Sequence, residues 1–146
     1  MATYSFTDVT ASLTGPTGDI DLGYGSTNAD EGIDTSMVGD KNTMTTGASK
    51  EGMHSLHSSD AGTVSLRYLK TAPNNALLMA MYDAQKASAA LWGQNVIIIR
   101  QTQSGDVTTA LQCAFKKKPD IKYAKEGDIL VWTFDSISID TVLGQY

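Results

Sequence analysis

The chain has 146 residues, of which 41% are hydrophobic and 18% are charged, and its net charge is −5. A chain of this length buries a hydrophobic core without a metal or a disulfide, and its single cysteine excludes an intrachain disulfide. The acidic charge, without a basic stripe interleaved with aromatic residues, argues against nucleic-acid recognition. We expect neither a signal peptide nor a membrane span, and we expect synthesis in a reducing cytoplasm.

The N-terminal third predicts short antiparallel strands. Residues 4–13 alternate between polar and apolar side chains, which is typical of a half-buried strand. Turn residues at 15–18 and a short strand at 19–22 complete a hairpin. Glycine and polar residues over 23–32 predict a loop, and residues 33–38 predict a third, weaker strand.

The segment from Gly39 to Gly62 breaks this pattern. Its sizeable apolar residues are Met44, Met53 and Leu56, and neither a period of 2 nor one of 3.6 is present. The sequence therefore predicts a long loop without regular structure. Such a segment cannot bury enough apolar surface to offset the entropy of ordering it. We expect it to be mobile in the free chain and ordered only against another surface.

The second half of the chain predicts a strand, a helix and three more strands. Alternation over 63–70 predicts the strand, and Pro73 precedes a helical pattern over 74–91 that Gly93 ends. Residues 95–102, 107–115 and 129–139 predict the last strands. The parity of 107–115 places Leu111, Cys113 and Phe115 on one face. The whole chain is predicted to be one mainly β domain over 1–146, an antiparallel β-sandwich or barrel of about seven strands with one flanking α-helix.

Several local patterns have residue types that could carry chemistry. His54 and His57 have the spacing of a helical metal-ligand pair, but the segment lacks helical periodicity, so exposed loop histidines are the preferred interpretation. Cys113 is a nucleophile only if a histidine folds beside it, and a buried thiol is preferred. Glycine-rich and acidic stretches lack the spacing of phosphate loops and EF-hands. The basic run at 116–118 is interpreted as a solvated strand end. We therefore predict no catalytic residue, no cofactor and no bound metal.

Two stretches resemble phage tail tube proteins. In the segment from Gly62 to Leu78, an alternating strand ends in a Thr-x-Pro-x-Asn turn and enters a leucine-rich helix. The stretch from Phe115 to Trp132 is similar to that family's C-terminal hairpin, and the order of the predicted elements also matches. The overall length and pattern resemble the contractile-tail, myovirus type.

This resemblance implies a structural virion protein. Its copies would form hexameric rings that stack into the inner tail tube, the conduit for DNA ejection, inside a contractile sheath. The loop at about 39–62 would contact the adjoining ring through a set of apolar and histidine side chains: Met44, Met53, His54, Leu56 and His57. The implied partners are other copies, the tail sheath, the baseplate or tube initiator and the tail terminator. DNA would pass without specific binding, and the particle would assemble in the host cytoplasm.

Polar strand faces beside the long loop are candidates for the lumen of such a tube. The residues assigned to this face are Thr35, Thr63, Ser65, Arg67, Thr108 and Gln112, with the small Ala110 between the last two. The alternative is that these faces meet solvent.

Two other functions remain open at this point. One is a tube protein of a related injection machine, either a tailocin or a secretion-system tube. The other is a small monomeric β module that grips a peptide or ligand with residues 44–56.

Overall fold

The structure, a computed structural model, describes residues 2–23 and 28–146, with the backbone alone for residues 28–31. Its described part is mainly β, with one α-helix, which confirms the predicted fold class. Seven antiparallel strands form the main sheet in the order β2-β1-β7-β8-β9-β6-β3. They are β1 (Val9–Gly15), β2 (Gly18–Gly23), β3 (Asn28–Met37), β6 (Gly62–Leu69), β7 (Asn95–Gln101), β8 (Asp106–Lys117) and β9 (Ile129–Val142). The other elements are η1 (Phe6–Asp8), β4 (Asn42–Thr46), β5 (Gly52–Leu56) and α1 (Asn74–Lys86).

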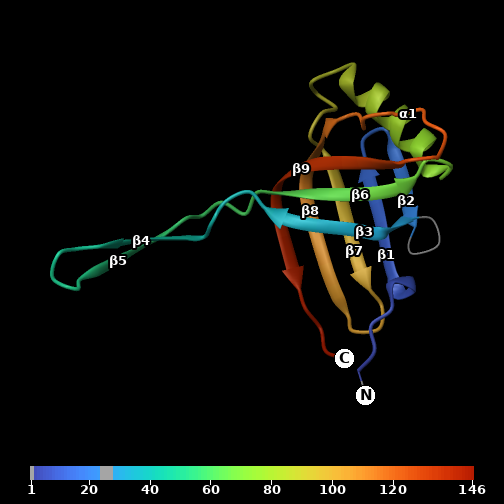
Figure 1. Cartoon of the computed structure of the whole chain (residues 1–146). Helices are drawn as coiled ribbons and strands as arrows, with labels where there is room; N and C mark the ends of the chain where they lie inside the picture. The colour runs from blue at the N-terminus through green and yellow to red at the C-terminus, as the bar shows by residue number, and fades with distance from the viewer. Residues whose placement is uncertain (1, 24–27) are drawn as a thin grey trace.

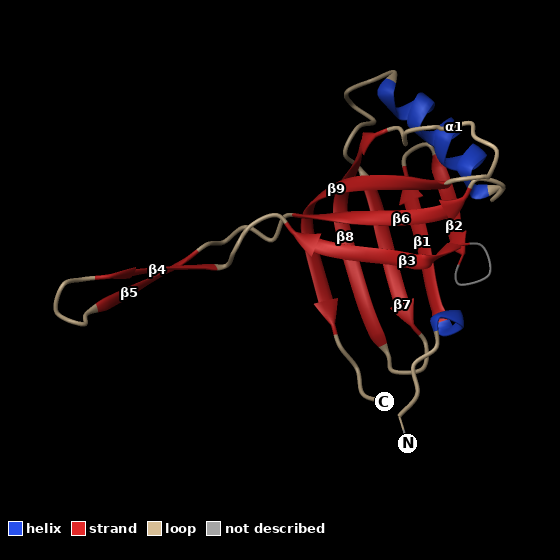
Figure 2. Cartoon of the chain, viewed as in Figure 1, coloured by secondary structure: helices blue, strands red, loops and turns tan. Residues whose placement is uncertain are grey.

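The main sheet folds over on itself because β9 is long enough to belong to both of its halves. Residues Ile129 to Ser136 of β9 pair with β6, and residues Thr133 to Val142 pair with β8, so that the two pairings overlap in the middle of the strand. In consequence β3, β6 and β9 cross over β1, β7 and β8 (Figure 1). The helix α1 covers one end of this sandwich, and the two termini lie at the other end (Figure 2).

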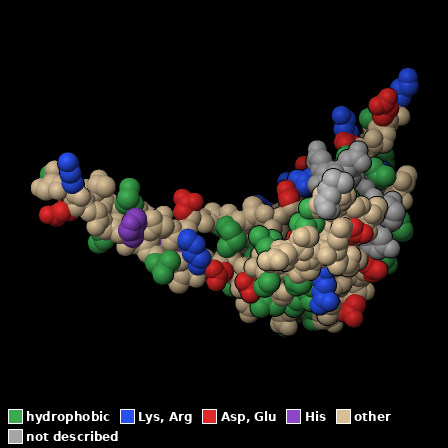
Figure 3. Space-filling view, turned by 90° about the horizontal axis from the view of Figure 1, so that it is seen from below, with side chains coloured by type: hydrophobic (Ala, Val, Ile, Leu, Met, Phe, Trp, Pro, Cys, Tyr) green, Lys and Arg blue, Asp and Glu red, His purple; other side chains and the backbone are tan. Residues whose placement is uncertain are grey.

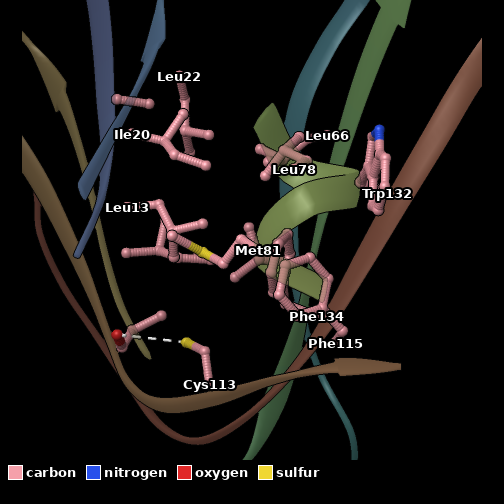
Figure 4. Close-up of a cluster of buried hydrophobic side chains, with 14 of the residues drawn as sticks. Leu13, Ile20, Leu22, Leu66, Leu78, Met81, Cys113, Phe115, Trp132 and Phe134 are labelled. Carbon is pink, nitrogen blue, oxygen red and sulfur yellow. Dashed lines mark hydrogen bonds between the residues drawn. The ribbon is translucent and has the colours of Figure 1, made fainter. Parts of the chain in front are cut away.

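A dense aromatic and aliphatic core fills the space between the two halves of the sheet. Trp132, Tyr68, Phe115 and Phe134 are the largest fully buried side chains. Phe115 has its ring centroid 4.5 Å from that of Phe134 and 6.0 Å from that of Trp132, distances typical of favourable aromatic pairs. Leu13 of β1 and Leu22 of β2 lie on the opposite side of the core, Leu66 of β6 lies beside Trp132, and α1 adds Leu78 and Met81 (Figure 4).

Buried polar contacts fix the helix against the sheet. Gln85 of α1 and Asn95 of β7 are both fully buried and exchange two amide hydrogen bonds, of 2.7 and 2.8 Å. Trp132 Nε1 donates to Asn75 Oδ1 at 3.1 Å. Because each of these buried polar groups has a partner, the helix position is specified as well as stabilised.

Three element boundaries differ from the predicted ones. The helix ends at Lys86 instead of residue 91, and the Ser88 hydroxyl then accepts a hydrogen bond from the Ala90 amide; serine competes in this way with helical hydrogen bonding. The first strand begins at Val9 because residues 6–8 form a 3-10 turn. The described backbone of 28–32, predicted as a loop, belongs to β3.

The predicted parity of β8 holds for Cys113 and Phe115 but is wrong for Leu111, which does not share their face. Ala110, Cys113 and Phe115 are all buried, whereas Leu111 is 44% exposed. A bulge causes this change, since one residue of β7, Val96, opposes two of β8, Leu111 and Gln112, and Gln112 adopts a left-handed φ of 52°. One extra residue in a strand reverses the facing of all residues that follow it.

Candidate assembly surfaces

The segment 39–61, which we call the arm, projects from the body as a β-hairpin (Figures 1 and 2). Its strands β4 and β5 pair with each other from Asn42↔Leu56 to Thr46↔Gly52, and Gly47 N donates to Glu51 O at 2.8 Å in the turn. The prediction of a loop without regular structure is therefore wrong for this segment. Both faces of the hairpin are exposed, so no alternation of apolar and polar residues marks it in the sequence.

The base of the arm is attached to the body by several contacts. Val38 N donates to Ala61 O at 3.0 Å, and Lys41 Nζ lies 2.7 Å from a carboxylate oxygen of Asp60. The Asp60 carbonyl in turn accepts a hydrogen bond of 3.0 Å from the Ile139 amide of β9. The arm is thus joined to the core sheet and leaves it in a defined direction.

The arm exposes large apolar side chains on both faces. Met44 is 60% exposed and Leu56 is 85% exposed on one face, and Met53 is 59% exposed on the other. Figure 3 shows hydrophobic side chains distributed along the arm between polar ones. A two-stranded hairpin is only marginally stable in water by itself, so burial of these side chains against a further surface would stabilise it.

His54 and His57 lie on opposite faces of this hairpin, because they are three residues apart along extended chain, in which successive side chains alternate faces. His54 Nδ1 is 3.1 Å from the Asn42 amide nitrogen, and His57 Nε2 is 2.7 Å from the Thr43 hydroxyl. The two imidazoles therefore do not form a shared metal site. Among the described residues, no group of three or more His, Cys, Asp and Glu side chains is placed to hold a metal.

Cys113 is buried in the core, which confirms the preferred interpretation of a structural thiol. Its Sγ donates to the Ala110 carbonyl at 3.4 Å (Figure 4). Burial raises the pKa of the Cys113 thiol, and this disfavours the nucleophilic thiolate. Both histidines lie on the arm, so neither accompanies Cys113. No helix of the described chain is long and apolar enough to cross a membrane.

Three of the six residues assigned to a lumen face share one surface. Thr63, Ser65 and Arg67 alternate with the buried residues of β6 and lie on its outer side. The Arg67 guanidinium is 3.3 Å from an Asp34 carboxylate oxygen, and the Ser36 and Thr63 hydroxyls are 3.3 Å apart. This outer side of β3 and β6 is therefore a connected polar surface.

The structure separates the other three residues from that surface. Thr35 pairs with the buried Val64, so it lies on the core side of the edge strand β3. Thr108 shares the core side of β8 with Ala110, near the termini, where its hydroxyl is 3.3 Å from that of Thr141. Gln112 lies in the bulge. Grouping all six residues on one face is therefore wrong, because cross-strand register and the bulge decide the facing.

The main sheet also presents two open edges. The strands at the ends of its order are β2 and β3, so each has one backbone edge that no described strand pairs. Unpaired N–H and C=O groups along an edge strand are ready to pair with another chain. The body thus offers edges, and the arm offers apolar side chains, for contacts with other molecules.

A family model for the bacteriophage PhiTE tail tube protein matches residues 1–144. The chain belongs to this tail tube family. The resemblance drawn from residues 62–78 and 115–132 is confirmed, and family membership gives the chain a structural role in a tail tube. The comparison with curated proteins finds no match.

Solved structures with the same fold come from contractile injection systems. The chain is similar to one in the sheath/tube terminator of the extracellular contractile injection system PVC, with a TM-score of 0.64, 11% identity and coverage of 97% of this chain and 98% of that chain. It is also similar to a chain in the PVC sheath–tube complex, with a TM-score of 0.62, 10% identity and coverage of 97% of this chain and 92% of that chain. A third similar chain is in the sixfold-symmetrised baseplate of the anti-feeding prophage AFP, with a TM-score of 0.61, 8% identity and coverage of 97% of this chain and 96% of that chain. At these identities the likeness shows the fold.

Proposed function

We propose that this protein assembles into hexameric rings that stack into the inner tube of a contractile phage tail, through which DNA is ejected. The observation that carries the proposal is the arm, which is joined to the body at its base and exposes Met44, Met53 and Leu56. Its role is structural, without catalysis. The tail particle would be built in the host cytoplasm.

Ring formation uses the open edges of the main sheet. Pairing of β2 of one copy with β3 of the next would satisfy both edges, as closure does in a barrel. Such a contact joins two different surfaces, and it closes into a ring when the rotation allows. Six copies agree with the sixfold symmetry of the baseplate that contains a similar chain.

Stacking uses the arm. A contact between the arm of one ring and the body of the next also joins different surfaces, but it does not close, so it extends the assembly into a filament. The apolar arm side chains Met44, Met53 and Leu56 would leave water in this contact, together with His54 and His57. Each fully buried side chain of the Met or Leu type contributes about 1.5–3 kcal/mol.

The polar outer surface of β3 and β6 is the lumen candidate that the geometry supports best. Thr63 and Ser65 offer neutral hydroxyls there, and Arg67 is paired with Asp34. With a net charge of −5 for the chain, such a wall would weakly repel DNA and let it pass without specific binding. The sheath, the baseplate or tube initiator and the tail terminator are the partners expected around and at the ends of the tube.

A tube protein of a related injection machine is the second candidate. The similarity to chains of PVC and AFP favours it, and the ring and the arm would act in the same way with a different cargo. Purified particles that contain tubes but no packaged DNA would support this candidate over a phage tail.

Shortening the arm tests the proposed assembly. Because His57 N donates to Lys41 O at 2.9 Å, a two-residue Asn-Gly turn can replace Asn42–Leu56 and join these ends. We expect this variant to remain folded but to form no stacked tubes in negative-stain micrographs. The matched control is Thr46→Ser, which keeps the arm. Tubes formed by the shortened variant would contradict the proposal.

A further inference from the structure

The segment 116–125 is a concentrated basic region in an acidic chain. It holds five lysines and a single acid, Asp120, so its net charge is +4, whereas the chain as a whole carries −5. All five lysines are exposed, while the buried Pro119 attaches the segment to the body. Neither the open edges nor the arm includes this region, so the assembly of identical copies leaves its charge unexplained.

A groove lies between this segment and α1. Its volume is about 580 Å³, and it is lined by Tyr82 of α1 and by residues 117–121. Tyr82 and Ile121, the latter 45% exposed, give the groove an apolar part, and Lys117 and Lys118 flank it. The acid in the lining, Asp120, is 4.0 Å from Lys117 Nζ, and both side chains are well exposed. A pair of that kind contributes little, so the lysines keep their capacity to bind another anion.

The C-terminal end of α1 extends the same surface. Lys86 Nζ lies 5.2 Å from the centre of the Tyr82 ring, and the centre of the Trp92 ring lies 6.2 Å from that of Tyr82 in an edge-to-face arrangement. Trp92 is 36% exposed. The result is an aromatic patch with three lysines around it, at the end of the body opposite the termini and away from the arm (Figure 1).

We propose that this groove docks an acidic, partly apolar segment of a different protein. Carboxylates of that segment would pair with Lys86, Lys117 and Lys118, and one of its apolar side chains would lie on Tyr82 and Ile121. The inference rests on the proposed function in one respect, that other proteins act around the tube. Complementary charge at the rim and apolar contact at the centre are the usual composition of a protein interface.

Other occupants fit less well. The β4–β5 hairpin of a second copy carries one lysine and one glutamate over 42–56, so it supplies no net negative charge. A nucleic acid needs a row of cations along its backbone and is repelled by the chain's overall charge. A concave apolar groove with charges at its rim suits a side chain from a polypeptide better than a phosphate ladder.

The test uses a fluorescently labelled synthetic peptide in which Glu alternates with Leu, titrated with the full chain and followed by anisotropy. We expect binding that weakens as salt rises. Lys117→Glu combined with Lys118→Glu should weaken it by roughly tenfold or more. The control, Lys50→Glu combined with Arg100→Glu, changes the net charge equally but lies outside the groove, and it should leave the affinity unchanged. Ile121→Gln should weaken binding several-fold without changing its salt dependence.

Several results would overturn the proposal. Equal losses in the two double variants would show a response to net charge alone. Equal affinity for a single-stranded DNA oligonucleotide would show a general polyanion surface, and loss of peptide binding once the chain has assembled into tubes would assign the groove to a contact between copies. The arm-shortened variant separates this proposal from the proposed function, because it should bind the peptide normally even though it forms no tubes. If the chain assembles normal tubes but does not bind the peptide, the docking site is refuted and the proposed function still stands.

Discussion

The body and the arm use the same secondary structure with different sources of stability. In the body, antiparallel strands carry side chains such as Leu66 and Trp132 that are fully buried. In the arm, β4 and β5 are equally regular in register, yet Leu56 is 85% exposed. Hairpins of two strands need further packing to persist. The comparison indicates that the core of the body is packed within one chain, whereas the apolar side chains of the arm are left exposed by it.

Truncating one large side chain in each region should give the largest contrast. Phe134→Ala removes a ring that packs 4.5 Å from Phe115 in the core, and we expect it to lower the free energy of unfolding by about 3–5 kcal/mol. Met53→Ala on the arm should change it by less than about 0.5 kcal/mol. Chemical denaturation of the unassembled chain measures both. Similar losses in the two variants would erase the distinction between the regions.

Alkaline pH should weaken the body through Tyr68. Burial is the main cause that raises its pKa to about 12, and its hydroxyl donates to the Leu22 carbonyl at 2.5 Å. Because the folded-state pKa exceeds the usual value of 10, the folded chain holds this proton more tightly. The resulting stability is fully present below pH 10 and is lost as pH rises towards 12, by about 2.7 kcal/mol for two pKa units.

Denaturation curves recorded across this pH range test the assignment. Tyr68→Phe should flatten the decline in stability, whatever its effect at neutral pH. Tyr123→Phe is the control, because that side chain is 85% exposed and should leave the decline in place. A decline unchanged by Tyr68→Phe would assign the alkaline sensitivity to another group.

The two glycines at the ends of the arm should respond differently to a methyl group. A Cβ at Gly62 would meet the Ser36 carbonyl oxygen and lie 2.7 Å from Ile139 Cδ1, whereas a Cβ at Gly39 would meet nothing within 4 Å. We expect Gly62→Ala to cost about 1–3 kcal/mol and Gly39→Ala to be close to neutral. Thermal unfolding of both variants is the measurement. A neutral Gly62→Ala would show that the junction of arm and body shifts at little cost to accommodate the added methyl group.

Removing single ion pairs should have the smallest effect in either region. Asp34→Asn breaks the pair with Arg67 on the body, and Asp60→Asn breaks the pair with Lys41 at the base of the arm. Both acids are more than half exposed, so each loss should stay below about 1 kcal/mol. A larger loss for Asp60→Asn would mean that this charge, besides the Asp60 carbonyl, holds the arm in place.

The sequence predicted the strands of the body well because one face of each strand is buried, and this leaves an alternation of apolar and polar residues. Residues such as Val64, Leu66 and Tyr68 alternate with polar neighbours, and that alternation is the physical consequence of one face meeting the core. The arm lacks this signal because both of its faces are exposed. Threonine at positions 43, 45 and 46 was the remaining hint, since β-branched residues favour strands.

The proposed contact residues of the arm remain a prediction, and the structure adds their geometry. The five arm residues from Met44 to His57 were placed on the segment that projects from the body, and all five are exposed. The grouping of the lumen candidates on one face is wrong for Thr35, Thr108 and Gln112, because facing depends on cross-strand register and on a bulge. Neither feature leaves a mark in the local sequence. The groove beside Tyr82 also escaped detection, since it joins α1 to residues far along the chain.

Hydrogen exchange measured on the free chain and on assembled tubes tests the central claim most directly, that the arm is completed by other copies. The prediction is that amides of residues 42–56 exchange rapidly in the free chain and become protected in the tube, while core amides of β6 and β9 are protected in both. An arm already as protected as the core in the free chain, or one still unprotected in assembled tubes, would contradict it.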